Sequence, residues 1–275
     1  MTKNKYDSSN ETLLTFGGHL EVLRRMLFRI LGVLLVVGVV VFCLKDETFG
    51  LILAPTKDEF CFYGWVEDFL HFFGSSFRFE AMNVQMISTE LSTQFMTHLT
   101  SSIYVALLLS SPYILFELFG FIAPALYENE KRSSKIVLLM VYLLFILGVL
   151  ISYFILFPLS FRFLVTYQVE SSIENTITIS SYISTFTTLT LMVGVAFQLP
   201  IVSYILGRMR ILSSAQLKHF RRYALFVITI LSAVITPPDI MSCFFVMGPL
   251  YLLYECSIYV VKFTEKRQTV FKNDE

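Results

Sequence analysis

The sequence predicts an all-α polytopic membrane protein in which six transmembrane helices of unequal length form one domain over residues 1–275. Three observations support this fold class. Hydrophobic residues make up 55% of the chain and charged residues only 15%, whereas soluble domains are about a quarter charged. The apolar residues come in long runs, and the basic residues collect in alternate connections between those runs.

The spans follow from run length, because a helix needs about 20 predominantly apolar residues to cross a bilayer. The first run is preceded by a polar stretch and has no small-residue cleavage site after it, so we expect it to stay in the membrane rather than to be removed as a signal peptide. The predicted spans are residues 27–44, 95–119, 136–157, 182–206, 223–235 and 240–261.

The fifth run, residues 223–235, is the shortest and would cover only about 20 Å as a helix. A re-entrant segment is the alternative. The stop Thr236-Pro237-Pro238-Asp239 is followed at once by another apolar run. Two helices joined by a tight proline turn are therefore the simpler account, with a thinned bilayer or tilted neighbours matching the short span.

The orientation follows from the basic residues. Seventeen of the 21 Lys and Arg fall in segments 1–29, 124–135, 207–222 and 262–275. The positive-inside rule places these segments, and both termini, in the cytoplasm. Residues 45–94 then form a long outer loop, which carries more acidic than basic residues.

The middle of that outer loop, residues 57–80, contains Trp65 and several Phe residues. Aromatic rings favour the headgroup zone of a bilayer. This composition predicts an interfacial element that lies on the membrane, and a small soluble cap is the alternative.

Motifs of catalysis are missing from the sequence. It contains no GxSxG, HExxH, Walker loop or GxGxxG. The four His fall in separate segments and the four Cys lack metal spacing, so we expect no enzyme, no metal site and no cofactor. The cysteines are expected to be small buried apolar residues, with a Cys43–Cys61 disulfide as the alternative for that pair.

Polar side chains inside the apolar runs are few. Charge at the bilayer centre costs about 2.5–3.5 kcal/mol on insertion scales, so such groups normally face protein or water. Gln198 and Glu255 lie within the fourth and sixth runs, and we expect them to form an intramembrane polar patch, with helix packing alone as the alternative. Glu117 lies at the inner end of the second run, where a functional role and simple contact with water remain open.

Motifs along nearly the whole chain resemble those of the TatC family, a subunit of the twin-arginine protein translocase. The segment HLEVLRR, residues 19–25, resembles the HLxELRxR motif near the start of the family. Ser110–Arg132 resembles its second span and first cytoplasmic loop, and Arg221–Glu255 its fifth span, TPPD turn and sixth span. Shorter matches are Ala54-Pro55, Tyr153-Phe154, Phe157-Pro158-Leu159 and Phe197-Gln198-Leu199-Pro200.

The resemblance implies a concave, glove-like receptor in the bacterial cytoplasmic membrane. Such a receptor recognises the twin-arginine signal peptides of folded proteins and nucleates their export, driven by proton-motive force. Its implied partners are TatA-type and TatB-type single-span proteins, precursor proteins, the lipid bilayer and further copies of itself, without nucleic acid. The implied signal-peptide-binding residues are Glu21, Arg24, Phe121, Glu128 and Glu130. The implied outer cap and turn residues are Pro55, Phe95 and Asp239, and the polar patch is Gln198 with Glu255.

Two departures from the family pattern bear on these roles. The motif Glu stands three residues after the His, where this chain has Val22, and the carboxylate comes one position earlier at Glu21. A helix turns about 100° per residue, so Glu21 presents a different face. Gln198 replaces the Glu of some members, which removes a titratable group from a proton relay.

A small-molecule or ion permease is the rival from another class. It would need convergent intramembrane charges or paired broken helices, and one Glu with one Gln gives it little support. An intramembrane protease has less, because the apolar runs contain no nucleophile with a partner base and no paired Asp.

Overall fold

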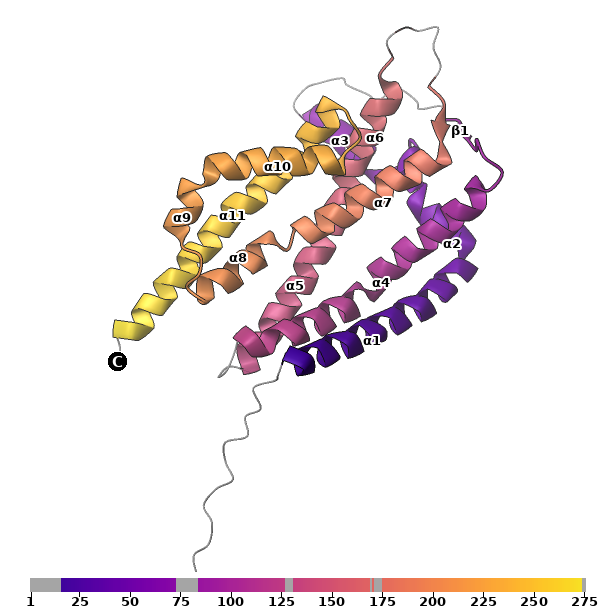
Figure 1. The fold of residues 1–275 in the computed structure, drawn as a ribbon. Coiled ribbons are helices and arrows are strands. Elements are labelled where there is room, and N and C mark those ends of the chain that lie inside the picture. The colour runs from indigo at the N-terminus through magenta and orange to yellow at the C-terminus, as the bar shows by residue number, and fades with distance from the viewer. Residues whose placement is uncertain (1–15, 73–83, 127–130, 169, 171–174, 274–275) are drawn as a thin grey trace, which may run out of the picture.

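The computed structural model describes residues 16–72, 84–126, 131–168, 170 and 175–273, and most of these residues are helical (Figure 1). A short parallel strand pair joins β1 (Met86–Ile87) to β2 (Ile177–Thr178). The helices are α1 (Phe16–Cys43), α2 (Lys45–Ile52), η1 (Ala54–Thr56), α3 (Cys61–Phe72), α4 (Thr93–Leu126), α5 (Lys131–Ile151), the π-helix η2 (Ser152–Leu156), α6 (Phe157–Thr166), α7 (Ile179–Ala196), α8 (Leu199–Arg208), α9 (Ser214–His219), α10 (Arg221–Ile235) and α11 (Ile240–Asn273).

Five helical stretches within the described residues are long and apolar enough to cross a membrane, and the predicted all-α polytopic membrane fold is confirmed. α10 has 15 residues and is shorter than these five, so its role as a further crossing remains a prediction. The five stretches are Leu20–Cys43, Thr93–Phe121, Ile136–Thr166, Ile179–Arg208 and Ile240–Lys266.

Proline explains two irregularities inside these stretches. Pro158 has no N–H, and its ring would clash with the carbonyl four residues earlier in a regular helix. The chain widens into the π-helix η2 directly before it, which relieves that clash. Pro200 stands in the first turn of α8, where a missing N–H costs nothing, and α7 ends just before it at Ala196.

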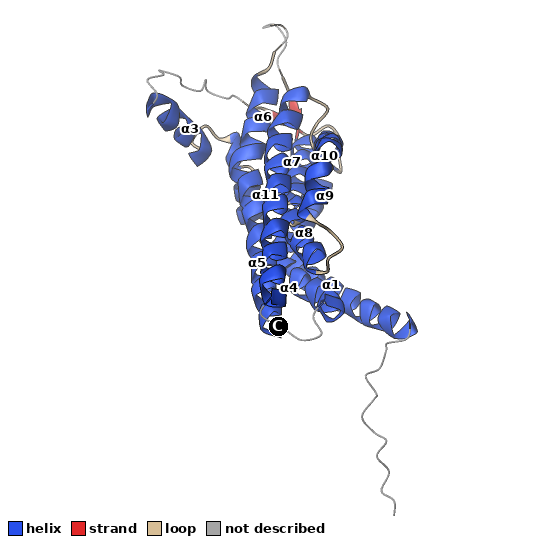
Figure 2. Cartoon of the chain, turned by 90° about the vertical axis from the view of Figure 1, so that its left-hand side faces the viewer, coloured by secondary structure: helices blue, strands red, loops and turns tan. Residues whose placement is uncertain are grey.

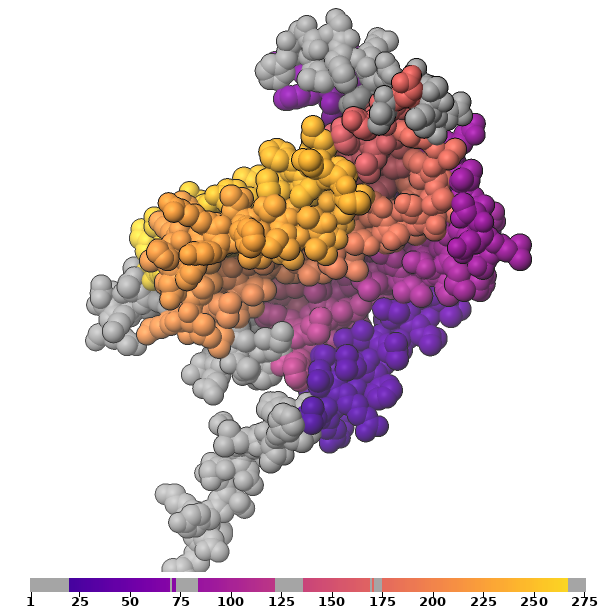
Figure 3. All heavy atoms as spheres, turned by 45° about the horizontal axis from the view of Figure 1, so that its top comes forward, coloured from indigo at the N-terminus to yellow at the C-terminus, as the bar shows by residue number. Residues whose placement is uncertain are grey.

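The helices form a flattened, open bundle. Figure 1 shows them spread side by side, whereas in the view of Figure 2 they overlap in a narrow column. Figure 3 shows one face hollowed between α1 and the segment α8–α10. Both ends of the described chain lie at the same end of the bundle (Figure 1), here named the terminal end. The opposite end, with α2, α3, α6 and the two strands, is named the cap end.

Aromatic side chains build the core near the cap end. The Phe157 ring lies 5.2 Å from that of Tyr182 and 4.9 Å from that of Phe186, both edge-on. The buried hydroxyl of Tyr182 donates to the carbonyl of Ile52 at 2.7 Å. Tyr153 donates to the carbonyl of Leu51 at 2.8 Å. These long-range bonds fix α2 against the bundle, and the buried Tyr182 hydroxyl would cost about 1–3 kcal/mol if it lost its partner.

Glycine permits a close approach of α5 and α7 in the middle of the bundle. A Cβ placed at Gly148 of α5 would lie 2.7 Å from the ring of Phe197, which follows α7. A Cβ at Gly194 of α7 would lie 3.0 Å from Val149. Small residues at such crossings let helices approach closely in membranes.

The expectation of buried cysteines is wrong for three of the four. Cys43, Cys61 and Cys256 are exposed, Cys243 is partly buried, and all four are free. The Cys43–Cys61 disulfide is therefore not formed in this structure. A membrane protein shows apolar side chains to lipid, which is as apolar as the protein interior, so a small apolar residue in a span has no need to be buried.

Candidate functional site: a charged groove between α1 and α4

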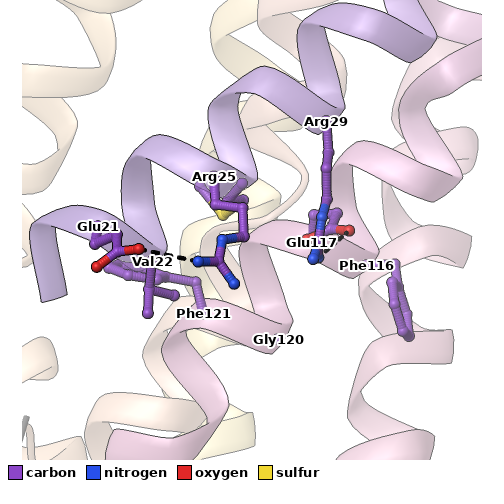
Figure 4. A pocket seen from close by; sticks show the side chains of 9 residues that line it. Glu21, Val22, Arg25, Arg29, Phe116, Glu117, Gly120 and Phe121 are labelled. Carbon is purple, nitrogen blue, oxygen red and sulfur yellow. Dashed lines mark hydrogen bonds and ion pairs between the residues drawn. The ribbon is translucent and has the colours of Figure 1, made fainter. Parts of the chain in front are cut away.

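A groove opens at the terminal end, where the start of α1 lies against the end of α4 (Figure 4). Its volume is about 510 Å³. Charged side chains alternate with apolar ones around it. The groove, here named the α1–α4 groove, is lined by Glu21, Val22, Arg25, Met26, Arg29, Phe116, Glu117, Gly120 and Phe121.

The first ion pair of the groove lies along α1. Arg25 Nη2 donates to Glu21 Oε1 at 2.9 Å, and the two side chains are 66% and 69% exposed. An exposed pair at this helical spacing contributes only about 0.3–0.5 kcal/mol, because water and salt screen it. Glu21 is therefore loosely held and open to another cation.

The second ion pair joins the two helices. Arg29 Nη1 of α1 lies 3.6 Å from Glu117 Oε1 of α4. Tyr113, one turn earlier on α4, donates its hydroxyl to the same carboxylate oxygen at 2.9 Å. The Glu117 side chain is only 15% exposed, so it is the more desolvated of the two acids. Glu117 is therefore a paired, partly buried acid, and its functional role stays a prediction.

Apolar side chains line the rest of the groove. Met26 is buried at 5% exposure, and Phe121 is partly buried. A Cβ at Gly120 would meet nothing within 4 Å, so the groove stays open there. The site therefore combines two carboxylates with an adjacent apolar surface, which suits a ligand that carries guanidinium groups beside an apolar segment.

The structure brings together only part of the predicted signal-binding set. Glu21 and Phe121 both line the groove (Figure 4). Arg24 does not line the groove. Its guanidinium lies 5.7 Å from the centre of the Phe28 ring. Glu128 and Glu130 lie outside the described residues.

Sequence reasoning missed Arg25, Arg29 and the role of Glu117 in this site. Arg25 and Arg29 follow Glu21 at intervals of four residues, so one face of a helix carries all three. That periodicity was the available signal. Glu117 stood out as an acid at the inner end of an apolar run, but its contact with Arg29 of another helix had no signal in the sequence.

The two residues of the predicted polar patch have different partners. Gln198 Nε2 donates to the carbonyl of Val141 on α5 at 3.1 Å. Glu255 Oε2 accepts from Arg221, the first residue of α10, at 2.7 Å, and Glu255 Oε1 accepts from Tyr251 at 3.1 Å. Glu255 thus belongs to a charged contact between α10 and α11, and the structure records no hydrogen bond between it and Gln198 in the part of the chain that it describes.

The predicted cap and turn residues lie apart from one another, and two of them accept local hydrogen bonds. Pro55 is buried, and its carbonyl accepts the Tyr63 hydroxyl at 3.0 Å. Asp239 Oδ1 accepts the backbone N–H of Ser242 at 2.6 Å, which caps the start of α11. Phe95 is 58% exposed on α4.

A buried cation stabilises the cap. The Arg162 side chain of α6 is 8% exposed, lies 3.8 Å from Asp58 Oδ1, and places its guanidinium 4.7 Å from the centre of the Tyr63 ring. Burial raises the pKa of Tyr63 to about 12, although nearby Arg162 opposes the shift. Tyr63 therefore stays neutral at physiological pH and keeps its hydrogen bond to Pro55.

The fold and the groove together define a multi-pass α-helical membrane protein with a charged groove at the terminal end of the bundle. The family model for the Sec-independent protein translocase protein TatC matches residues 18–249. The chain belongs to the TatC family. It is accordingly a protein of the transport class, and this membership overturns the permease alternative.

Relatives and solved structures agree with this assignment over most of the chain. TatC of Blattabacterium sp. subsp. Periplaneta americana is 33% identical over 259 residues, which cover 93% of this chain and 97% of the relative. TatC of Helicobacter pylori strain ATCC 700392 / 26695 is 38% identical over 70% of this chain and 76% of the relative. The crystal structure of the twin-arginine translocase receptor TatC superposes with a TM-score of 0.73 at 29% identity, covering 90% of this chain and 99% of that chain.

Proposed function

We propose that this protein is the receptor subunit of a twin-arginine translocase, which binds twin-arginine signal peptides and nucleates the export of folded proteins across the bacterial cytoplasmic membrane. The observation that carries this proposal is the α1–α4 groove, where the carboxylates of Glu21 and Glu117 lie beside apolar side chains. Similarity to the solved twin-arginine translocase receptor supports the same assignment.

Binding would proceed by exchange of cations. Glu21 and Glu117 already pair with Arg25 and Arg29, so each carboxylate is compensated before the ligand arrives. An incoming pair of guanidiniums would replace the resident arginines and form bidentate, charge-assisted hydrogen bonds. Neither carboxylate would lose its counter-charge during the exchange, which keeps the desolvation penalty low.

The other members of the predicted surface have complementary roles in this proposal. Phe121 would contact the apolar segment of the signal peptide beside its arginines. Glu130, with Glu128, would add a further acceptor from the connection after α4, and Arg24 would lie at the edge of the surface. We expect Glu130→Gln to weaken peptide binding while leaving membrane insertion intact.

The groove must face the cytoplasm to meet a precursor before its transport. We propose six crossings, with α10 as the short fifth one and both termini in the cytoplasm. The common position of the two ends of the described chain supports an even number of crossings (Figure 1). The basic residues of segment 207–222 support the orientation through the positive-inside rule.

The translocase also requires partner proteins. We propose that TatA-type and TatB-type single-span proteins, and further copies of this chain, assemble on its membrane surface and use proton-motive force. Gln198 and the Arg221–Glu255 pair would offer polar contacts to such helices, because Glu255 remains 21% exposed and Arg221 44% exposed. Cross-linking from α8 and α11 in native membranes tests these contacts, and failure to trap any partner near either residue would count against them.

The decisive experiment measures binding of a twin-arginine signal peptide to the purified protein in lipid nanodiscs. A peptide with two lysines in place of the arginines is the matched control. It keeps the charge but lacks the planar guanidinium groups that bind a carboxylate through two hydrogen bonds. We expect tighter binding of the arginine peptide by about tenfold or more, as each lost bidentate contact is worth about 1–3 kcal/mol. Equal binding of the two peptides would remove the proposed recognition mechanism.

A further inference from the structure

We propose that α3 is an interfacial anchor whose aromatic face inserts into the lipid leaflet at the cap end of the bundle. The aromatic face of α3 is defined here as Trp65, Phe69 and Phe72. It is a membrane-binding surface distinct from the spans and from the α1–α4 groove. The inference does not depend on the function proposed above.

The three side chains of the aromatic face are unusually open. Trp65 is 64% exposed, Phe69 63% and Phe72 84%. They follow one another at intervals of four and three residues, which places them on one side of the helix. Three large aromatic side chains that gather on one helix face mark an interaction site rather than a water-exposed surface.

A second side of α3 packs on the protein. Phe62 and Tyr63 are buried, and Val66 packs against the same cluster, which includes Tyr153 and Phe154 of η2. Arg162 holds this side through its contact with the Tyr63 ring. The helix therefore has a fixed rotation about its own axis, and that rotation decides where the aromatic face points.

A third side of α3 is polar and solvent-exposed, with Asp68 and His71. At about 100° per residue, the aromatic face lies between the packed side and the polar side. This three-sided arrangement is typical of a helix that lies in a membrane interface next to a bundle, with one side on protein, one in lipid and one in water.

The position of α3 favours lipid as the occupant. It packs on η2 and α6, which belong to the candidate span Ile136–Thr166. Ile155 and Leu164 on that stretch are exposed, at 42% and 36%, so the stretch against which α3 packs also shows apolar side chains at its surface. Figure 2 shows α3 leaning sideways from the bundle at the cap end. Trp and Phe at this level are suited to the headgroup boundary.

Trp65 is the single tryptophan of the chain, so its fluorescence reports on the aromatic face without any substitution. The experiment uses the full-length protein in phosphatidylcholine–phosphatidylglycerol nanodiscs at one copy per disc. Discs with a nitroxide on the lipid headgroup or at acyl carbon 5 are compared with discs labelled at acyl carbon 16. We expect a blue-shifted emission, at least twofold stronger quenching by the shallow labels, and little quenching by aqueous iodide.

A depth reference comes from the double variant Trp65→Phe/Leu35→Trp, because Leu35 is 62% exposed in the middle of the candidate span Leu20–Cys43. Its emission should be quenched more strongly by the acyl carbon 16 label. Iodide quenching of Trp65 without lipid quenching would overturn the proposal in favour of a water-exposed cap. Shielding of Trp65 from iodide and from every lipid label would overturn it in favour of a protein contact.

Discussion

The two ends of the bundle hold their charged side chains in opposite ways. At the cap end, Arg162 is buried against Tyr63, and the Tyr63 hydroxyl is fixed to the carbonyl of Pro55. At the terminal end, Glu21 and Arg25 pair while both remain about two-thirds exposed. The buried contact stabilises a fixed shape, whereas the exposed pair can exchange partners at little cost. The difference indicates a rigid cap and, at the groove, an exposed ion pair that can exchange partners.

The helices that form the two regions also differ in how much of their apolar surface is buried. Only 11% of the apolar window in Leu20–Cys43 is buried, against 39% of that in Ile179–Arg208. The first forms one wall of the groove, and the second contributes Tyr182 and Phe186 to the core near the cap. Low burial lowers the cost of local movement, so adjustment on ligand binding is expected in α1 rather than in α7.

The largest change in free energy is expected from a substitution at the cap end. Arg162→Leu should lower the free energy of unfolding by about 3 kcal/mol, since it removes a buried cation with its ion pair and its ring contact. Thermal unfolding in detergent measures the loss, and proteolysis within residues 57–80 should become faster. Lys57→Leu is the matched control, because Lys57 is exposed and should change stability by less than about 0.5 kcal/mol. Equal effects of the two variants would contradict a rigid cap.

A somewhat smaller loss of stability is expected in the middle of the bundle, where α5 meets the junction of α7 and α8. Gly148→Ala should destabilise the protein by about 1–3 kcal/mol, because the added Cβ would overlap the Phe197 ring. Gly32→Ala is the control, since a Cβ there meets nothing within 4 Å. The pair can be compared by thermal unfolding in the same detergent. A harmless Gly148→Ala would mean that Phe197 moves away easily and that this contact is not rigid.

Within the groove, the partly buried carboxylate of Glu117 should contribute more to peptide affinity than the exposed carboxylate of Glu21. Glu117→Gln is expected to weaken twin-arginine peptide binding by about tenfold, which corresponds to about 1.4 kcal/mol, because the variant keeps the shape and loses the charge. Calorimetry or fluorescence anisotropy in nanodiscs measures this change. Glu47→Gln, an exposed acid on α2 at the cap end, should leave the affinity unchanged. An equal loss in both variants would indicate a general effect of charge rather than a site.

The smallest change in peptide affinity is expected at the exposed ion pair of Glu21 and Arg25. Glu21→Gln should weaken peptide binding only about twofold, in line with the modest energy of a screened surface contact. Raising the salt from 0.05 to 0.5 M should remove most of that difference, because screening at high ionic strength acts on exposed charges first. If Glu21→Gln instead exceeds Glu117→Gln at both salt concentrations, the ranking of the two carboxylates by burial is wrong.

Hydropathy, charge asymmetry and motif order were sufficient to predict the all-α membrane fold and the TatC family. Of the predicted binding residues, Glu21 and Phe121 both line the α1–α4 groove, and their binding role stays a prediction. These sequence features did not predict that Glu117 would pair with Arg29 across two helices, or that Arg24 would lie over Phe28. They also did not predict the separate partners of the two polar-patch residues, the Val141 carbonyl for Gln198 and Arg221 for Glu255.

The amino-acid sequence by itself determined which segments prefer lipid and which motifs they carry, because transfer of apolar residues from water depends on composition along one segment. Only the tertiary structure decided which side chains meet, because contacts between helices depend on the rotation and crossing of each helix against its neighbours. At Gly148 the missing side chain leaves the space that the Phe197 ring occupies, and this contact helps to set how the two segments cross. The residues that meet in the groove depend in the same way on the packing of several helices.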